Sequence, residues 1–414
     1  MGEQPHGVSL YLHVPFCVSK CAYCDFTSAA DDPCARVPAE TVHYVADALP
    51  SGADYGDAYV AALLAYLEEF VDAGVLHAVP SVYIGGGTPT LLGSRLAGLV
   101  TALRALPGLS ADTEVTVEAN PDSLTPALAA ELASAGVTRV SLGVQSFDDQ
   151  VLAWLGRRHD AAAAEAAASA LRAAGLPFSV DLMCGVPGQV AASWAESVQR
   201  AIATGAGHVS VYPLSVEDDT PLAASIARGE VPEPDADTAA DHLAVAATAL
   251  RAAGFERYEV ASYARPGQEC RHNIRYWTGG AYLGVGPGAA SMLPVHTAKK
   301  TPLSARVVYS WPDDWRVRFT WHDTTSGFLS CLWDCPPVAI EALDASDAVR
   351  EDAMLGLRLS AGITDELATR AGAQTGLAEL ADAGLVEHVG GRWRTTERGW
   401  LLGNEVFGRV WSGE

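Results

Sequence analysis

Residues 11–26 read Tyr11-Leu-His-Val-Pro-Phe-Cys17-Val-Ser-Lys-Cys21-Ala-Tyr-Cys24-Asp-Phe26, and they place three thiols in one short loop after an apolar segment. Such a loop can wrap three corners of an iron–sulfur cube. A [4Fe-4S] cluster normally takes four thiolates, and no fourth cysteine lies nearby, so one iron would stay open for a small-molecule ligand. The alternative is a zinc site completed by His13 or a distant cysteine, although this cysteine spacing after a strand is unusual for zinc.

Two kinds of segment alternate from the N-terminus to about residue 260. Short segments rich in β-branched residues predict strands, and Ala/Leu-rich segments such as Tyr59–Phe70 and Ala161–Ala174 predict helices. This alternation is typical of parallel βαβ units, and six repeats predict an α/β fold with an incomplete (β/α)6 barrel. The predicted strands are Ser9–Val14, Ser81–Gly85, Glu114–Glu118, Arg139–Gln145, Ser179–Met183 and His208–Pro213.

The pattern changes after residue 295, which predicts one domain over residues 1–295 and a smaller one over residues 296–414. The second domain has amphipathic segments followed by an alternating stretch around Gly390-Gly391, and this order is typical of a winged-helix-like α+β domain. Its candidate recognition helix carries Glu379 and Asp382 where a nucleic-acid reader would carry basic residues. A structural or partner-docking role is therefore favoured.

Composition narrows the class of protein. The 414 residues carry a formal net charge of -23, which opposes binding to nucleic acid because phosphates repel an acidic surface. The sequence shows no signal peptide and no apolar run long enough to span a membrane, so a cytoplasmic location is expected. Eight cysteines are too few for a disulfide scaffold, and three of them crowd into the loop quoted above, which points to metal ligation.

Glycines and polar residues stand where the predicted strands end. The run Gly85-Gly86-Gly87-Thr88 follows the second strand, and glycine lets a ligand approach the backbone closely. Isolated polar residues in apolar strands are costly to bury unless they are partnered, so they indicate ligand contacts or helix caps. Arg157 presents paired donors suited to a carboxylate, although a surface arginine is the alternative. The strand-end polar residues are Glu118, Gln145 and Asp181.

The cysteine spacing resembles that of the radical S-adenosylmethionine (SAM) superfamily, and the resemblance spans about residues 8 to 292. It implies that Cys17, Cys21 and Cys24 hold the cluster and that the amine and carboxylate of SAM chelate the open iron. Tyr23 and Phe26 stand where that family packs on adenine. The glycine run resembles the motif that binds the methionyl amine of SAM.

Further residues resemble the coproporphyrinogen-dehydrogenase-like branch of this superfamily. They include Tyr212-Pro-Leu-Ser-Val-Glu217, Tyr258-Glu-Val-Ala-Ser-Tyr263 and Gly284-Val-Gly-Pro-Gly288. The resemblance implies that SAM contacts Tyr11, Gly86, Gly87, Thr88, Glu118, Gln145, Arg157 and Asp181.

Within that branch, His272-Asn273-Ile-Arg-Tyr276-Trp277 resembles a motif of the heme-chaperone family HemW. The resemblance implies that the protein also binds heme, through residues 255–292. His272 would coordinate the heme iron, because imidazole is a natural axial ligand. A structural histidine beside aromatic residues is the alternative. Cys270 is either a rival ligand or a buried thiol.

Two classes of protein compete for the function. The porphyrinogen-decarboxylating enzymes carry a Cys-Gly-Cys ending and a longer N-terminal arm, whereas this chain reads Cys24-Asp25-Phe26 with sixteen residues ahead of Cys17. These differences favour a heme chaperone that binds a [4Fe-4S] cluster, SAM and heme and transfers heme to an unidentified acceptor protein, as a monomer or homodimer. Radical SAM chemistry on a porphyrinogen, methyl transfer and cyclopropanation are the alternatives, and the sequence leaves open whether SAM is cleaved.

Overall fold

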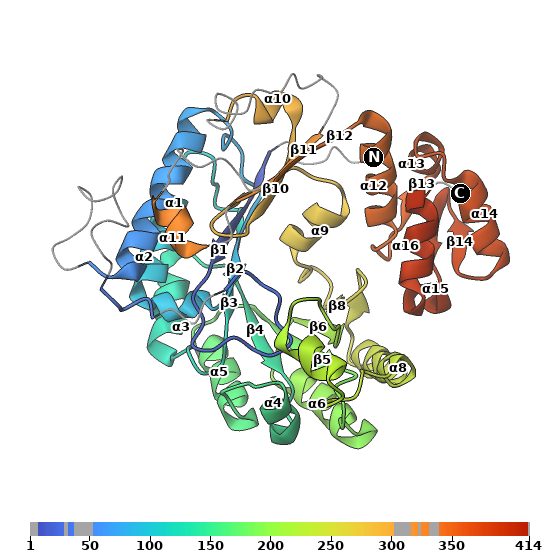
Figure 1. Ribbon diagram of the computed structural model, residues 1–414, viewed down its shortest axis with the longest axis horizontal. Helices are drawn as coiled ribbons and strands as arrows, with labels where there is room; N and C mark the ends of the chain where they lie inside the picture. The colour runs from blue at the N-terminus through green and yellow to red at the C-terminus, as the bar shows by residue number, and fades with distance from the viewer. Residues whose placement is uncertain are drawn as a thin grey trace.

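The computed structural model describes residues 7–28, 32–36, 53–301, 316–321, 324–330 and 339–412. Its centre is a 12-stranded sheet with the strand order β12-β11-β10-β9-β1-β2-β3-β4-β5-β6-β8-β7. Helices form an arc around one side of this curved sheet (Figure 1). A separate group of small elements packs beside the sheet near the C-terminus. The fold is therefore an α/β sheet with a smaller appended unit, as predicted.

Six consecutive strands of the sheet are parallel and form its middle. Their inward and outward residues are almost all buried, as expected where a parallel sheet is covered on its faces. All six lie where the sequence predicts strands. They are β1 (Ser9–Val14), β2 (Ser81–Gly86), β3 (Glu114–Ala119), β4 (Arg139–Gln145), β5 (Phe178–Cys184) and β6 (His208–Pro213).

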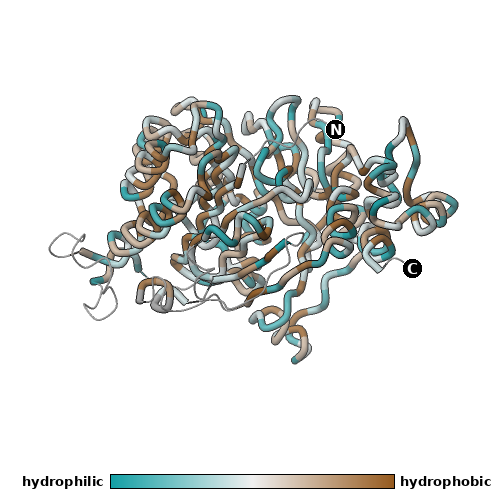
Figure 2. The backbone as a smooth tube through the Cα atoms, turned by 90° about the horizontal axis from the view of Figure 1, so that it is seen from above, coloured by the Kyte–Doolittle hydropathy of each residue, from teal (hydrophilic) through white to brown (hydrophobic). Residues whose placement is uncertain are grey.

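The helices between these strands bury one apolar stripe against the sheet and leave a polar stripe outside. Figure 2 shows hydrophobic (brown) and hydrophilic (teal) residues intermixed along the backbone. The alanine-rich helix follows this rule, because Leu171 and five alanines are buried and Asp160 caps its first turn. The helices are α1 (Tyr55–Asp72), η3 (Pro89–Leu92), α2 (Ser94–Arg104), α3 (Pro126–Ala135), α4 (Asp149–Trp154), α5 (Ala161–Ala173), α6 (Ala191–Ala203), α7 (Pro221–Ala227) and α8 (Ala236–Ala252).

The remaining strands extend both edges of the sheet. On one side β9 pairs in parallel with β1, and β10, β11 and β12 follow antiparallel. On the other side β8 and β7 pair antiparallel to β6. The elements are β7 (Glu256–Arg257), β8 (Ser262–Ala264), α9 (Arg271–Trp277), β9 (Tyr282–Val285), β10 (Ala290–Pro294), α10 (Val295–Ala298), β11 (Arg316–Thr320), α11 (Thr325–Ser330) and β12 (Ala339–Leu343). The sheet thus continues past residue 295, where the sequence predicts a domain boundary.

The C-terminal unit has its own hydrophobic cluster, drawn from Ala353 to Val410. Its three-stranded antiparallel sheet has the order β13-β15-β14, and the β14–β15 hairpin lies where the alternation around Gly390-Gly391 predicts one. The elements are α12 (Ala345–Gly356), β13 (Ile363–Thr364), α13 (Asp365–Arg370), α14 (Gln374–Asp382), β14 (Val386–Val389), β15 (Arg392–Thr395), α15 (Glu397–Leu401) and α16 (Gly403–Ser412). Cys331 and Cys335, whose spacing could suggest a second cluster site although two thiols alone make a poor one, lie outside the described residues.

Candidate functional site

The three cysteines of the loop after β1 line one cavity of about 340 Å³ at the carboxyl ends of the parallel strands. The described part of the chain holds no three His, Cys, Asp or Glu side chains placed to share a single metal ion. The thiolates of an iron–sulfur cluster bind separate irons. Cys270 also borders the cavity, but its sulfur is directed to Glu114, at the amino end of β3. The three-thiol donor set therefore fits a cluster with one open iron.

The glycine run after β2 docks against the cysteine loop. The amide of Gly87 donates to the carbonyl of Val14 and the amide of Thr88 donates to that of Phe16, both over 2.7 Å. A Cβ on Gly87 would lie 2.6 Å from the Phe16 carbonyl oxygen and 3.0 Å from the Cys17 sulfur. Only glycine tolerates this approach, so the turn fixes the loop that carries the first cysteine.

Glu118 lies at the wall of the same cavity, next to the glycine turn. Its two carboxylate oxygens accept hydrogen bonds from the Tyr83 hydroxyl at 2.8 Å and the Gly86 amide at 3.0 Å. Burial raises the pKa of this carboxyl to about 7, with Asp181 adding to the rise, although the two hydrogen bonds oppose it. The carboxyl group therefore changes charge near neutral pH.

This raised pKa predicts a pH-dependent stability. Above the unfolded pKa of 4.5 the unfolded chain loses the Glu118 proton more readily than the folded chain, so the folding stability falls as pH rises to about 7 and then levels. We expect Glu118→Gln to gain stability relative to the native chain across that window, on the order of 3 kcal/mol. Urea unfolding of both proteins at pH 5 and pH 8 measures the difference. An equal difference at the two pH values would contradict the prediction.

Arg157 connects three parts of the site. One guanidinium nitrogen donates to Asn120 Oδ1 at 2.6 Å and to the Gly143 carbonyl at 2.9 Å, and the other lies 3.8 Å from the Cys21 sulfur. These partners hold the planar guanidinium against the cavity lined by the cysteines. A carboxylate bound beside the cluster loop would meet its donors.

Gln145 and Asp181 complete the polar wall. Gln145 ends β4 in the left-handed region at φ 66°, and the β4–β5 register shifts between Leu142 and Gln145. A bulge of this kind re-aims a side chain and is common beside active sites. Asp181 accepts a hydrogen bond from the Ser141 hydroxyl at 2.9 Å, and burial raises its pKa. Both residues line the cavity.

With this geometry in place, comparisons with known proteins identify the family. The profile of the radical SAM superfamily matches residues 11–201, and that of the HemN C-terminal domain matches residues 343–402. The heme chaperone HemW of Mycobacterium tuberculosis strain H37Rv is 39% identical over 411 residues, covering 98% of this chain and 95% of the relative. The chain belongs to the HemW family of radical SAM proteins.

Other HemW relatives agree with this placement. Heme chaperone HemW of Escherichia coli is 38% identical over 286 residues, covering 68% of this chain and 69% of the relative. Among solved structures, coproporphyrinogen III oxidase HemN from Escherichia coli, described as a radical SAM enzyme, matches with a TM-score of 0.72 at 22% identity. The match covers 98% of this chain and 90% of the HemN chain, so the fold is HemN-like throughout.

The aromatic residues expected at SAM differ in their placement. Tyr23 and Phe26 line the cavity, and the Phe26 side chain is 58% exposed. Tyr11 does not line it; its hydroxyl lies 2.9 Å from Nδ1 of His13, and its ring stacks with that of Tyr83. The predicted contact between Tyr11 and SAM would therefore require His13 or Tyr83 to move.

The HemW-type motif lies on α9, where His272 is only 1% exposed. Its Nδ1 lies 2.9 Å from the Ser81 hydroxyl and its Nε2 lies 2.9 Å from the Tyr276 hydroxyl. Burial lowers the pKa of the imidazole to about 3, so the ring is neutral. In this arrangement both nitrogens have hydrogen-bond partners, and binding of an iron by His272 requires one of these contacts to open.

Two wall residues were not predicted from the sequence. Asn120 orients Arg157 and also donates to the Thr88 hydroxyl at 2.9 Å, and Tyr83 holds Glu118. Asn120 directly follows β3, so the rule that polar residues at strand ends meet the ligand would have found it. Tyr83 lies inside β2, and only its partner across the sheet reveals its role.

Proposed function

We propose that this protein is a heme chaperone of the radical SAM type. The proposal is supported by the names of the HemW relatives and by sequence identity that extends, for one of them, over almost the whole chain. In this role Cys17, Cys21 and Cys24 hold the [4Fe-4S] cluster, and Arg157, Glu118 and the glycine turn bind SAM. Heme is bound at the segment that includes α9 and passes to an acceptor protein.

The residues of the cavity have separate tasks in this proposal. The cluster and SAM, when bound, supply one-electron chemistry at the open iron. Arg157 orients a carboxylate beside the cysteine loop, and the Gly86–Thr88 turn, which lines the same cavity, meets the amine of the ligand. Glu118 holds or releases a proton near neutral pH.

Hemin titration tests the proposal directly. We expect the native chain to shift the Soret band of hemin at a stoichiometric ratio. His272→Ala should weaken hemin binding on the order of tenfold, because α9 loses the contacts of the imidazole with Ser81 and Tyr276. His296→Ala, an exposed histidine on α10, is the matched control and should titrate as the native chain does. An unchanged titration of His272→Ala would remove this residue from the site.

The competing enzymatic function has its own readout. Incubation of the reconstituted protein with coproporphyrinogen III, SAM and a reductant under anaerobic conditions should leave the porphyrinogen intact. Decarboxylated product, detected by mass spectrometry, would overturn the chaperone proposal. Failure of the native chain to bind hemin would overturn it as well.

A further inference from the structure

Helix α9, which carries the HemW-type motif, lies between the barrel and the C-terminal unit. It contacts β2 on one side and α12 on the other (Figure 1). The helix has only seven residues. Isolated helices shorter than about 12–15 residues are marginal in water. The position of α9 therefore depends on the contacts that hold its two ends.

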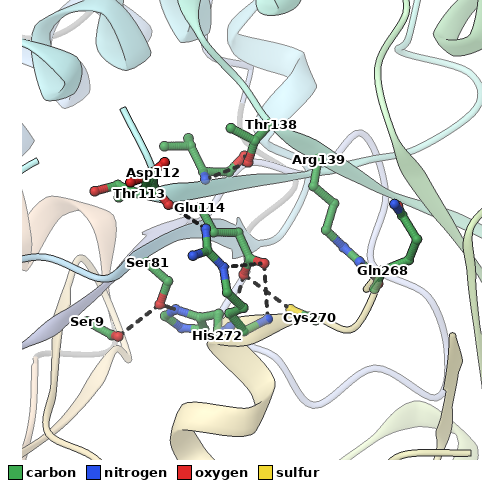
Figure 3. A network of polar contacts seen from close by, with 12 residues as sticks. Ser9, Ser81, Asp112, Thr113, Glu114, Thr138, Arg139, Gln268, Cys270 and His272 are labelled. Carbon is green, nitrogen blue, oxygen red and sulfur yellow. Dashed lines mark hydrogen bonds and ion pairs between the residues drawn. The ribbon is translucent and has the colours of Figure 1, made fainter. Parts of the chain in front are cut away.

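The barrel holds the start of α9. One oxygen of Glu114 accepts from the His272 amide at 2.9 Å, and the other accepts from the Arg271 amide at 3.0 Å. The Ser81 hydroxyl lies 2.9 Å from Nδ1 of His272, and the Tyr83 ring stacks on the imidazole. Figure 3 shows Glu114 and Ser81 against the first turn of the helix. These contacts fix that turn to β2 and β3.

The C-terminal unit holds the end of α9 through Arg358, which follows α12. Trp277 is the last residue of the helix, and the guanidinium carbon of Arg358 lies 5.2 Å from the centroid of its ring. The same carbon lies 4.6 Å from the ring centroid of Phe407, a buried residue of α16. A cation over aromatic rings is attracted by their electron-rich faces. Arg358 therefore joins the motif helix to the core of the C-terminal unit.

The two rings, more than hydrogen bonds, keep the Arg358 side chain in place. Its Nε is buried without a hydrogen-bond partner among the described residues, and an unsatisfied buried donor costs free energy. Burial also lowers the pKa of the guanidinium, although the nearby Glu259 opposes this shift. The stacking on Trp277 and Phe407 offsets these costs, so the position of the guanidinium is tied to the position of α9.

The turn after α9 lies directly against α12. Gly279 has a φ of 65°, and a Cβ at this position would lie 2.0 Å from Oδ1 of Asp352. Asp352 is itself held by Arg316 of β11, whose two terminal nitrogens donate to its two oxygens at 2.5 and 2.6 Å. Only glycine allows this approach, so the end of the motif helix and α12 are fitted closely together.

A second link connects the C-terminal unit to the start of α9. The Ser360 amide donates to the Tyr258 carbonyl at 2.9 Å, and Nε1 of Trp400 donates to the Val260 carbonyl at 2.7 Å. The Tyr258 hydroxyl in turn accepts from the amide of Cys270, the N-cap residue of α9, at 3.3 Å. Both ends of the motif helix are thus linked to the C-terminal unit, one directly and one through Tyr258.

We propose that the C-terminal unit positions α9 for its cargo and that the stack of Arg358 on Trp277 carries this effect. A helix that is held at both ends presents one arrangement of the motif, so binding of a metalloporphyrin does not first have to order it. Arg358 is a positioning residue, because it acts through Trp277 and not by touching the iron. The inference rests on the proposed function for the identity of the cargo.

Hemin affinity and local hydrogen exchange test this contact together. Arg358→Met removes the guanidinium but keeps a long side chain. It should weaken hemin binding on the order of tenfold and speed amide exchange in α9 by a similar factor, while exchange in β1 to β6 stays native. Arg358→Lys keeps a cation over the rings and should recover most of the lost affinity. In a Trp277→Leu background, Arg358→Met should have little further effect, because its partner is already gone.

Arg370→Met is the matched control, because it removes an exposed arginine from α13 of the same unit. It should bind hemin and exchange its α9 amides as the native chain does. Circular dichroism melts show whether each variant is folded. If Arg358→Met is not folded, Arg358→Gln takes its place in the comparison.

The outcomes separate this inference from the function on which it rests. If the native chain binds hemin and Arg358→Met binds it as tightly as Arg370→Met does, the contact does not position the motif, while the chaperone proposal stands. If the native chain binds no hemin, the chaperone proposal falls and the effect on cargo falls with it. Unchanged exchange of α9 in Arg358→Met overturns the positioning role in either case.

Discussion

Replacement of Cys17, Cys21 or Cys24 by alanine should reduce the iron and sulfide bound after anaerobic reconstitution from about four of each per chain to near zero. Each thiol lines the same cavity, and the loop that carries them offers no replacement thiol. The absorbance of the cluster near 400 nm, measured with iron and sulfide counts, checks the result.

Cys34→Ala is the control for this prediction, because Cys34 is an exposed free thiol and does not line the cavity. It should reconstitute like the native chain. Full iron and sulfide retention in any of the three loop variants would contradict the assignment, as would reconstitution with zinc alone.

Arg157→Leu should weaken SAM binding by at least about thirtyfold, since a buried charge partner typically contributes 2–5 kcal/mol. The guanidinium is held by Asn120 and Gly143 at the wall of the cavity, so its loss removes a positive charge positioned beside the cysteine loop. Equilibrium dialysis with labelled SAM on the reconstituted protein measures the change.

Arg172 on α5 provides the control. It is exposed, donates to the Ser169 hydroxyl at 3.0 Å and does not line the cavity, so Arg172→Leu should bind SAM as the native chain does. Iron content must be counted in both variants, because Arg157 also approaches the Cys21 sulfur. Equal SAM affinity of the two variants at equal iron content would remove Arg157 from the SAM site.

The strands and part of the cavity lining could be predicted because they depend on local patterns. A buried parallel strand is an apolar run whatever its neighbours, so β1 to β6 lie within a residue of the predicted bounds. Polar residues of those strands meet at one edge, and Glu118, Gln145 and Asp181 do line one cavity. Arg157, which follows α4, lines the same cavity.

Other features could not be predicted because they depend on contacts between distant parts of the chain. The left-handed conformation of Gln145 comes from a bulge against β5, and no local signal in its sequence requires it. The sheet continues with β11 and β12 because they pair with β10 across a long connection, and the change in composition at residue 295 does not mark its end. Of the two hydrogen-bond partners of His272, Tyr276 belongs to the motif, but Ser81 lies 191 residues away and no local pattern indicates it.

The stacking of Tyr83 on His272 has a thermodynamic consequence. The Tyr83 hydroxyl holds Glu118 at the cavity of the cysteine loop, and the Tyr83 ring stacks on the His272 imidazole of α9 with ring centroids 5.2 Å apart. If a ligand bound beside Glu118 changed the affinity of a ligand bound beside α9 by some factor, the second ligand would have to change the affinity of the first by the same factor. Titrating either ligand with the other present would then measure one coupling free energy.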